Sequence, residues 1–181
     1  DVCSSDLIAS NAPYHLNAIL PNDIVVLSLR EVDSDFHCRF DAISRSYNYY
    51  IYSQKDPFLE DRGYFFPYRL NREILQECAA ELLRHTNFQT FAKKNSQSKT
   101  FDCQLVKSEW MEEGSCLVYK VEGNRFLRGM VRGLVGTMLR AGTGKLGFQE
   151  FVEVIKSGDQ ARADFSVPPQ GLFLMAVRYP Q

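Results

Sequence analysis

The chain has 181 residues, of which 45% are hydrophobic, and its formal net charge is −1 at pH 7. This length allows one ordinary domain or two small ones around an apolar core, and the total charge by itself identifies no partner. Between residues 84 and 145, however, basic side chains outnumber acidic ones, so this half could face a polyanion. The basic residues are Arg84, Lys93, Lys94, Lys99, Lys107, Lys120, Arg125, Arg128, Arg132, Arg140 and Lys145, and the acidic ones are Asp102, Glu109, Glu112, Glu113 and Glu122.

The cysteines and histidines point away from metal chemistry. Five cysteines are scattered without a CxxC pair, and the three histidines lie far apart in the sequence. We therefore expect no metal site, no disulfide framework and a reducing, cytoplasmic environment. Arginines interrupt the longest apolar helical pattern, so we also expect no membrane-spanning segment.

The first seven residues, Asp1–Leu7, have no hydrophobic period and do not begin with methionine. The codons GAC GTG TGC TCT TCC GAT CT would encode this string, and they read like the end of a common sequencing-library adapter. Our hypothesis is that residues 1–7 are a non-native leader.

Two strands are expected in the first third of the chain. A Pro-Asn-Asp turn at residues 21–23 precedes an alternating, β-branched run at Ile24–Arg30. Further on, Tyr47, Tyr49 and Ile51 alternate with polar and aromatic residues, which predicts a strand with two aromatic faces. Such tyrosines usually form core and cross-strand contacts, but one beside Arg45 could equally stack on a base.

The middle of the chain predicts a helix and a hairpin. Asn71 is a plausible N-cap for a helix whose apolar residues run from Ile74 to Leu83. The polar and basic stretch 87–100 is either a surface loop or an arm that contacts phosphates. Alternating residues at Cys103–Met111 and Cys116–Val121 then predict two strands joined by a tight turn.

A helix over Asn124–Met138, ending near Ala141-Gly142, is the most informative prediction. Its apolar residues repeat at a spacing of four, its arginines form a second row, and its glycines form a third. Arginines beside such a stripe usually extend into water, and glycines can serve helix packing alone. Glycines in a helix cost stability, however, so they indicate close approach by another backbone or by a ligand. The arginines are Arg125, Arg128 and Arg132, and the glycines are Gly129, Gly133 and Gly136.

The last part predicts a short amphipathic helix at Phe148–Lys156, closed by Gly158, and a near-continuous apolar strand at Leu172–Val177. Strands and helices mix without a βαβ rhythm, and no Walker loop is present. The fold class expected is therefore α+β, with a mainly antiparallel sheet and packed helices.

Four stretches, taken together and in order, resemble the tRNA pseudouridine synthase A family, whose enzymes isomerise uridines in the tRNA anticodon stem-loop. They are LNAILPNDI (Leu16–Ile24), FHCRFDAISRSYNYYIY (Phe36–Tyr52), NRFLRGMVRGLVG (Asn124–Gly136) and PPQGLFL (Pro168–Leu174). The resemblance covers nearly the whole chain. It implies a pseudouridine synthase-like fold in which residues 8–52 complete an N-terminal domain and cross the cleft, and residues 53–181 form a C-terminal α+β domain.

The resemblance also implies roles for individual residues. Tyr47 falls on the active-site tyrosine that lies against the target base, with Arg45 beside it as a substrate contact. Arg132 falls on the arginine that pairs with the catalytic aspartate, and Leu172 on a leucine that lines the pocket. The family needs no metal or organic cofactor, and it implies tRNA as partner and a homodimer.

The catalytic aspartate itself has no counterpart in this chain. The family carries it in a motif close to R-T-D-x-G-V-H-A, upstream of the segment that matches Leu16–Ile24. Arg39-Phe40-Asp41 has the R-x-D spacing but lacks the following Gly-Val-His. The resemblance therefore implies a synthase portion that is inactive alone. A non-catalytic RNA-binding module on the same scaffold is the alternative, and a packing or assembly domain is a third.

Overall fold

The computed structural model describes residues 11–94 and 99–180, so the predicted leader, Asp1–Leu7, lies outside the described residues. The chain divides into two compact units, residues 1–40 and 41–181. The domain boundary that we predict after Tyr52 concerns the full enzyme and stays a prediction.

The first unit contains one short helix, α1 (Ala12–Ile19), which the hydrophobic pattern did not predict. The turn that follows is formed as expected, because the Ile24 N–H donates to the Pro21 carbonyl at 3.0 Å. The strand predicted at Ile24–Arg30 is wrong. In its place the Asn17 side chain bonds both backbone groups of Val26, at 2.7 and 2.8 Å. Alternation alone does not make a strand when no described residue of the unit supplies a ladder partner.

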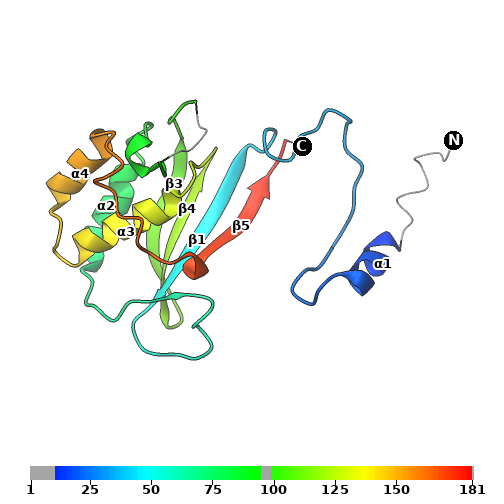
Figure 1. Cartoon of the computed structure of the whole chain (residues 1–181), viewed down its shortest axis with the longest axis horizontal. Coiled ribbons are helices and arrows are strands. Elements are labelled where there is room, and N and C mark those ends of the chain that lie inside the picture. Colours follow the sequence, from blue (N-terminus) through cyan, green and yellow to red (C-terminus); the bar gives the residue numbers. More distant parts are fainter. Residues whose placement is uncertain (1–10, 95–98, 181) are drawn as a thin grey trace. The chain divides into compact units, whose positions relative to one another are not determined.

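The second unit is a five-stranded sheet with three α-helices, and the predicted α+β class is confirmed. The strands are β1 (Ser44–Tyr52), β2 (Tyr64–Phe65), β3 (Leu105–Glu113), β4 (Cys116–Gly123) and β5 (Leu172–Arg178), and the helices are α2 (Arg72–Leu82), α3 (Met130–Gly142) and α4 (Phe148–Lys156). All pairings are antiparallel except that of β1 with β2. Figure 1 shows the three helices on the same side of the sheet.

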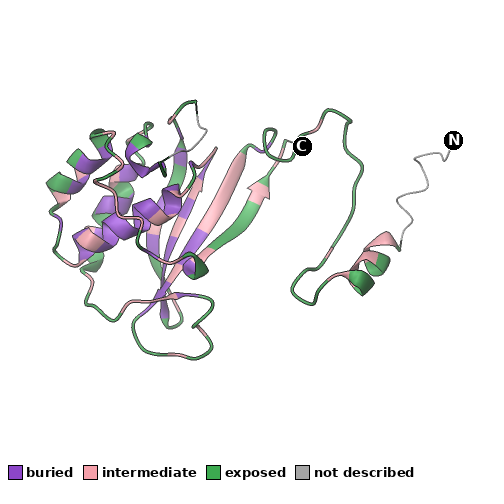
Figure 2. Ribbon diagram, in the orientation of Figure 1, coloured by how far each residue is buried: buried purple, intermediate pink, exposed green. Residues whose placement is uncertain are grey.

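Strand β1 lies at the centre of this sheet. Along one edge it pairs with β4, and along the other it pairs first with β5 and then, at its last two residues, with β2. Side chains from one face of β1 and β4, including Tyr49, Ile51 and Tyr119, enter the core beneath the helices. Figure 2 colours most of α3 as buried. The predicted tyrosine strand is therefore confirmed, and it links the core to the edge formed by β5.

Several local predictions are also confirmed. Asn71 caps α2, since its Oδ1 accepts from the Ile74 N–H at 3.1 Å. The hairpin of β3 and β4 forms as expected, and α4 has the predicted bounds, followed by Gly158 at a positive φ of 66°. These elements depend on contacts close in sequence, which a pattern can read directly.

Helix α3 begins later than predicted. It starts at Met130 rather than Asn124, because Gly129 takes a left-handed conformation with φ of 77°. The preceding residue, Arg128, uses its carbonyl to accept the Lys93 N–H at 2.8 Å instead of starting a helical ladder. Arg125 and Arg128 therefore lie before the helix, and the predicted arginine row is wrong; Arg132 alone of the three is on α3.

The first part of the polar stretch 87–100, residues 87–93, is more firmly anchored than a surface loop. Phe88 and Phe91 are fully buried, and the turn of 3₁₀ helix at Gln89–Phe91 contacts α4. The Thr90 hydroxyl donates to the Val154 carbonyl at 2.9 Å. The buried turn thus fixes the backbone that leads into Lys93 and Lys94, and Lys93 lies beside the start of α3.

Candidate active site

The candidate site begins with Tyr47 on β1. Its side chain is half-buried. Its ring forms a T-shaped contact with the ring of Phe126, with ring centroids 5.0 Å apart and ring planes at 78°. The register between β1 and β5 shifts between Ser46 and Tyr47, because Met175 of β5 has no partner on β1. Such irregularities re-aim side chains at the edges of sheets and near active sites. Tyr47 therefore packs against Phe126 and keeps part of its surface exposed.

Arg132 is the charged residue of the site, and its guanidinium is held by backbone. Its Nε donates to the Val167 carbonyl at 2.7 Å and its Nη2 donates to the Phe165 carbonyl at 3.2 Å. Among the ion pairs of residues 11–94 and 99–180, none involves Arg132. A half-buried guanidinium fixed in this way, with further N–H groups to offer, is suited to bind a carboxylate.

Tyr49 lies next to this arginine. Burial, with a smaller contribution from Tyr64, raises the pKa of the Tyr49 hydroxyl, and the positive charge of Arg132 opposes that rise. The hydroxyl is therefore a neutral donor, and it bonds the Pro168 carbonyl at 2.6 Å. Arg132 and Tyr49 thus meet on the same short segment, residues 165–168.

The first residues of β5 form an apolar wall beside these groups. Leu172 lies opposite Tyr49 in the ladder, and Leu174 lies opposite Tyr47. Directly paired residues of an antiparallel ladder share a face, so both leucines lie on the side of Tyr47. The predicted contact Leu172 packs against the core, whereas Leu174 is 53% exposed and is the nearer neighbour of Tyr47. Sequence reasoning missed Leu174. The available signal was its spacing of two from Leu172, which puts both leucines on the same face of the strand.

Strand β5 is not a buried strand, despite its apolar sequence. It pairs only with β1 among the described strands, and Phe173, Leu174 and Met175 are each at least 36% exposed. Figure 2 shows this strand as a mostly exposed ribbon beside the buried ones.

Arg45 has a structural anchor within the predicted site. Its Nη1 donates to the Asn124 carbonyl at 2.7 Å and to the Ala42 carbonyl at 3.1 Å. It shares the face of Tyr47, since the two residues are two positions apart on one strand. Arg45 therefore ties β1 to the loop before α3 and adds positive charge next to the tyrosine.

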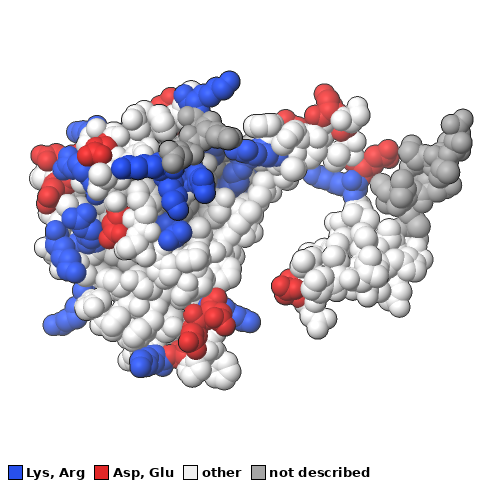
Figure 3. Space-filling view, viewed as in Figure 1, with Lys and Arg blue, Asp and Glu red and all other residues white. Residues whose placement is uncertain are grey.

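Further basic residues surround this loop. Lys93 bonds the Arg128 carbonyl through its backbone, and Arg125 donates from Nη1 to the Thr100 hydroxyl at 2.9 Å. Figure 3 shows Lys and Arg side chains gathered on the part of the surface where α3 begins. The predicted charge asymmetry thus corresponds to a cluster that we call the basic rim. It consists of Arg45, Lys93, Arg125 and Arg128.

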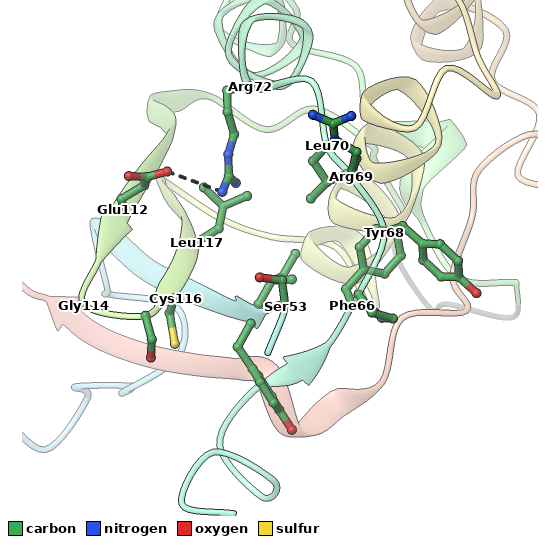
Figure 4. Close-up of a pocket in the computed structure, with 14 residues that line it drawn as sticks. Ser53, Phe66, Tyr68, Arg69, Leu70, Arg72, Glu112, Gly114, Cys116 and Leu117 are labelled. Atoms are coloured by element: carbon green, nitrogen blue, oxygen red, sulfur yellow. Dashed lines mark ion pairs between the residues drawn. The ribbon is translucent and has the colours of Figure 1, made fainter. Parts of the chain in front are cut away.

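Other features of the described residues lie apart from this site. Residues 11–94 and 99–180 contain no group of three or more His, Cys, Asp or Glu side chains that could hold a metal ion. No helix in those ranges is long and apolar enough to cross a membrane. A pocket of about 430 Å³ lies at the far end of β1, where Arg72 reaches towards Glu112 at 3.4 Å beside Ser53 and Leu117 (Figure 4). Because Tyr47 and Arg132 do not line it, this pocket is separate from the candidate site.

The fold and the site together define an α+β domain that presents a tyrosine, a fixed arginine and a basic rim. Residues 79–180 match the family described as tRNA pseudouridine synthase. The tRNA pseudouridine synthase A of Porphyromonas gingivalis is 40% identical over 180 residues, covering 98% of this chain and 71% of that protein. Those of Parabacteroides distasonis and Bacillus subtilis are 40% and 34% identical, covering 92% and 94% of this chain and 66% and 70% of each protein.

The chain belongs to the tRNA pseudouridine synthase family, and the resemblance inferred from its four stretches is confirmed. It spans about seven tenths of the length of the P. gingivalis relative.

Proposed function

We propose that this chain supplies the tyrosine, arginine and leucine of the active site of a tRNA pseudouridine synthase that acts on uridines of the anticodon stem-loop. The observation that carries the proposal is Arg132: its guanidinium is oriented by two backbone carbonyls, and no described carboxylate pairs with it. The aspartate nucleophile that would pair with it belongs to a motif absent from these 181 residues. The finer assignments of Tyr47, Arg45 and Leu172 follow from the family positions.

The proposed chemistry assigns a distinct physical task to each residue. The aspartate attacks and detaches uracil from its ribose, the base rotates, and a carbon–carbon glycosidic bond replaces the carbon–nitrogen bond. Arg132 keeps the carboxylate ionised, because a nearby positive charge lowers the pKa of an acid. In this proposal the Tyr47 ring lies against the flipped base, and its hydroxyl acts as the base in the final proton abstraction. Leu172, with Leu174, excludes water from that space.

The basic rim is proposed to bind the tRNA backbone. The guanidinium groups of Arg45 and Arg125 donate to the Asn124 carbonyl and the Thr100 hydroxyl, and the Arg128 carbonyl accepts the Lys93 N–H. Phosphate contacts of this kind set orientation and supply affinity, while the pocket at Tyr47 reads the base. The functional enzyme is proposed to be a homodimer with tRNA across both subunits.

A first experiment is to sequence the source DNA upstream of the codon for Ile8. An in-frame R-x-D-x-G-V-H-A motif would establish the nucleophile and support a synthase. A start codon close to Ile8 without such a motif would overturn the catalytic proposal and favour the RNA-binding module.

The 181-residue chain alone is expected to bind tRNA weakly and to form no pseudouridine, because the nucleophile is missing. Its affinity should fall steeply between about 50 and 200 mM salt, as counterions are released from the phosphates. Arg125→Ala and Arg128→Ala should each reduce the salt slope by about one. Arg84→Ala is the control, since Arg84 pairs with Glu81 at the end of α2. Pseudouridine formed at a substantial rate would refute the assignment of catalysis to an absent aspartate.

Tyr47→Phe in the full-length synthase should keep the fold and the ring contact with Phe126 but lower turnover roughly a hundredfold, the scale of general-base catalysis. The KM for tRNA should change little, because the stacking face is retained. Steady-state kinetics with Tyr50→Phe as control tests this, since Tyr50 lies on the other face of β1 and its hydroxyl accepts from the neighbouring Asn48 amide. Unchanged turnover would rule out an essential proton transfer by the Tyr47 hydroxyl.

A further inference from the structure

Residues 164–168, which we call the strap, lie against α3 between α4 and β5 (Figure 1). At one end the Asp164 N–H donates to the Thr137 hydroxyl at 3.0 Å. A Cβ added at Gly136 would lie 2.2 Å from the Asp164 carbonyl oxygen, and one at Gly133 would lie 2.8 Å from the Phe165 ring. The strap therefore touches the helix where only glycine leaves room.

The strap's carbonyls point at functional side chains. Phe165 and Val167 accept the two hydrogen bonds of Arg132, and Pro168 accepts the hydroxyl of Tyr49. Val167 is buried, so its bond to the Arg132 Nε is sheltered from water. Adjacent peptide units of the strap thus hold a helix residue and a strand residue at once.

Tyr49 fixes the other end of the strap. Its side chain is fully buried, and a Cβ added at Gly171 would lie 2.9 Å from its Cζ atom, so the ring is wedged beneath the turn that leads into β5. Its hydroxyl reaches Pro168, the residue directly after the one that orients Arg132. A shift of Pro168 would carry the Val167 carbonyl with it, because the two share a planar peptide group.

We propose that the strap sets the orientation of the Arg132 guanidinium, and that Tyr49 and Thr137 are positioning residues that hold the strap at its two ends. Orientation matters because a planar guanidinium pairs with a carboxylate through directed N–H groups. The strap leaves the other N–H groups of Arg132 for that partner. The catalytic consequence rests on the proposed function, whereas the orientation itself does not.

The direct test measures hydrogen exchange of the Arg132 Nε–H by ¹⁵N NMR in the 181-residue chain. Tyr49→Phe keeps the ring and removes only the bond to Pro168. We expect the Nε–H to exchange at least about fivefold faster, the factor that corresponds to one net hydrogen bond. Tyr50→Phe removes a hydroxyl from the opposite face of the same strand and should leave the exchange rate unchanged. An unchanged rate in Tyr49→Phe would overturn the proposal.

Thr137→Val is the second variant, because it removes the acceptor of the Asp164 N–H at the far end of the strap without touching Tyr49. It should also speed the exchange of the Arg132 Nε–H, and it keeps the test decisive if Tyr49→Phe does not fold. No change in a folded Thr137→Val chain would overturn the role of the strap as a unit.

A kinetic measurement separates this inference from the proposed function. In the full-length synthase, Tyr49→Phe should lower kcat about fivefold or more with little change in KM, because the Arg132 guanidinium is oriented less firmly. Faster exchange together with unchanged kcat would show that the strap holds Arg132 but that Arg132 has no part in catalysis. That result would overturn the proposed function and leave the orientation of the guanidinium standing.

Discussion

Replacing Arg132 by alanine is expected to lower the turnover of the full-length synthase by roughly a thousandfold, with tRNA affinity changed by less than about threefold. The reason is the proposed pairing of Arg132 with the nucleophile rather than with the RNA. Removing one partner of a buried ion pair costs about 3 to 5 kcal/mol, because the remaining charge is left without compensation. The aspartate would respond with a raised pKa and would be a weaker nucleophile at neutral pH. Single-turnover rates and tRNA binding, measured on the same preparation, check this.

Two further variants make the Arg132 result interpretable. Arg140→Ala removes another arginine of α3, whose guanidinium donates to the Arg162 carbonyl at 3.5 Å, and should leave turnover within about twofold. Arg132→Lys keeps a positive charge but cannot bond the Val167 and Phe165 carbonyls and a carboxylate with the same planar geometry. We expect it to restore only part of the activity. Equal losses of turnover and tRNA affinity in Arg132→Ala would instead make Arg132 a phosphate contact.

Strands β1, β3, β4 and β5 and most helices could be predicted from sequence because their determinants are local, whereas the short strand β2 was not predicted. Alternation marks β1 and the hairpin of β3 and β4, and the Asn71 side chain caps the helix that it precedes. The start of α3 could not be predicted in the same way. Phe126 and Leu127 fit the helical period, but the left-handed Gly129 and the bond between Lys93 and Arg128 end the pattern there. That bond joins segments far apart in sequence, and periodicity carries no information about such contacts.

In the candidate site, too, some features could be predicted from local sequence and others depend on contacts far apart in sequence. The family motifs place Tyr47 and Arg132, yet neither motif indicates what holds the arginine. Its acceptors lie more than thirty residues away in the strap, and they are backbone carbonyls, which leave no residue-type signal. Likewise, Leu174 becomes the neighbour of Tyr47 only through the register of β1 with β5. In each case topology, and not composition, brings the groups together.

The glycines of α3 were expected to permit close approach by a backbone or a ligand, and Gly136 meets that expectation through the Asp164 carbonyl. Gly136→Ala is therefore expected to destabilise the 181-residue chain by about 3 kcal/mol. The added methyl group would lie 2.2 Å from a backbone oxygen and 3.0 Å from its carbon, so relief requires the strap or the helix to move. The gain of about 1 kcal/mol that alanine brings to a helix interior is too small to offset this clash.

Thermal unfolding followed by circular dichroism tests the change, with an expected fall in Tm of about 6 to 12 °C for a chain of this size. Gly147→Ala is the matched control, because a Cβ at Gly147 meets nothing within 4 Å and its φ of −74° suits any residue. It should shift stability by less than about 0.5 kcal/mol. A Gly136→Ala chain as stable as the wild type would mean that the strap moves away from α3 at little cost. The strap would then be too loosely held to orient Arg132, so this stability measurement also bears on the catalytic geometry.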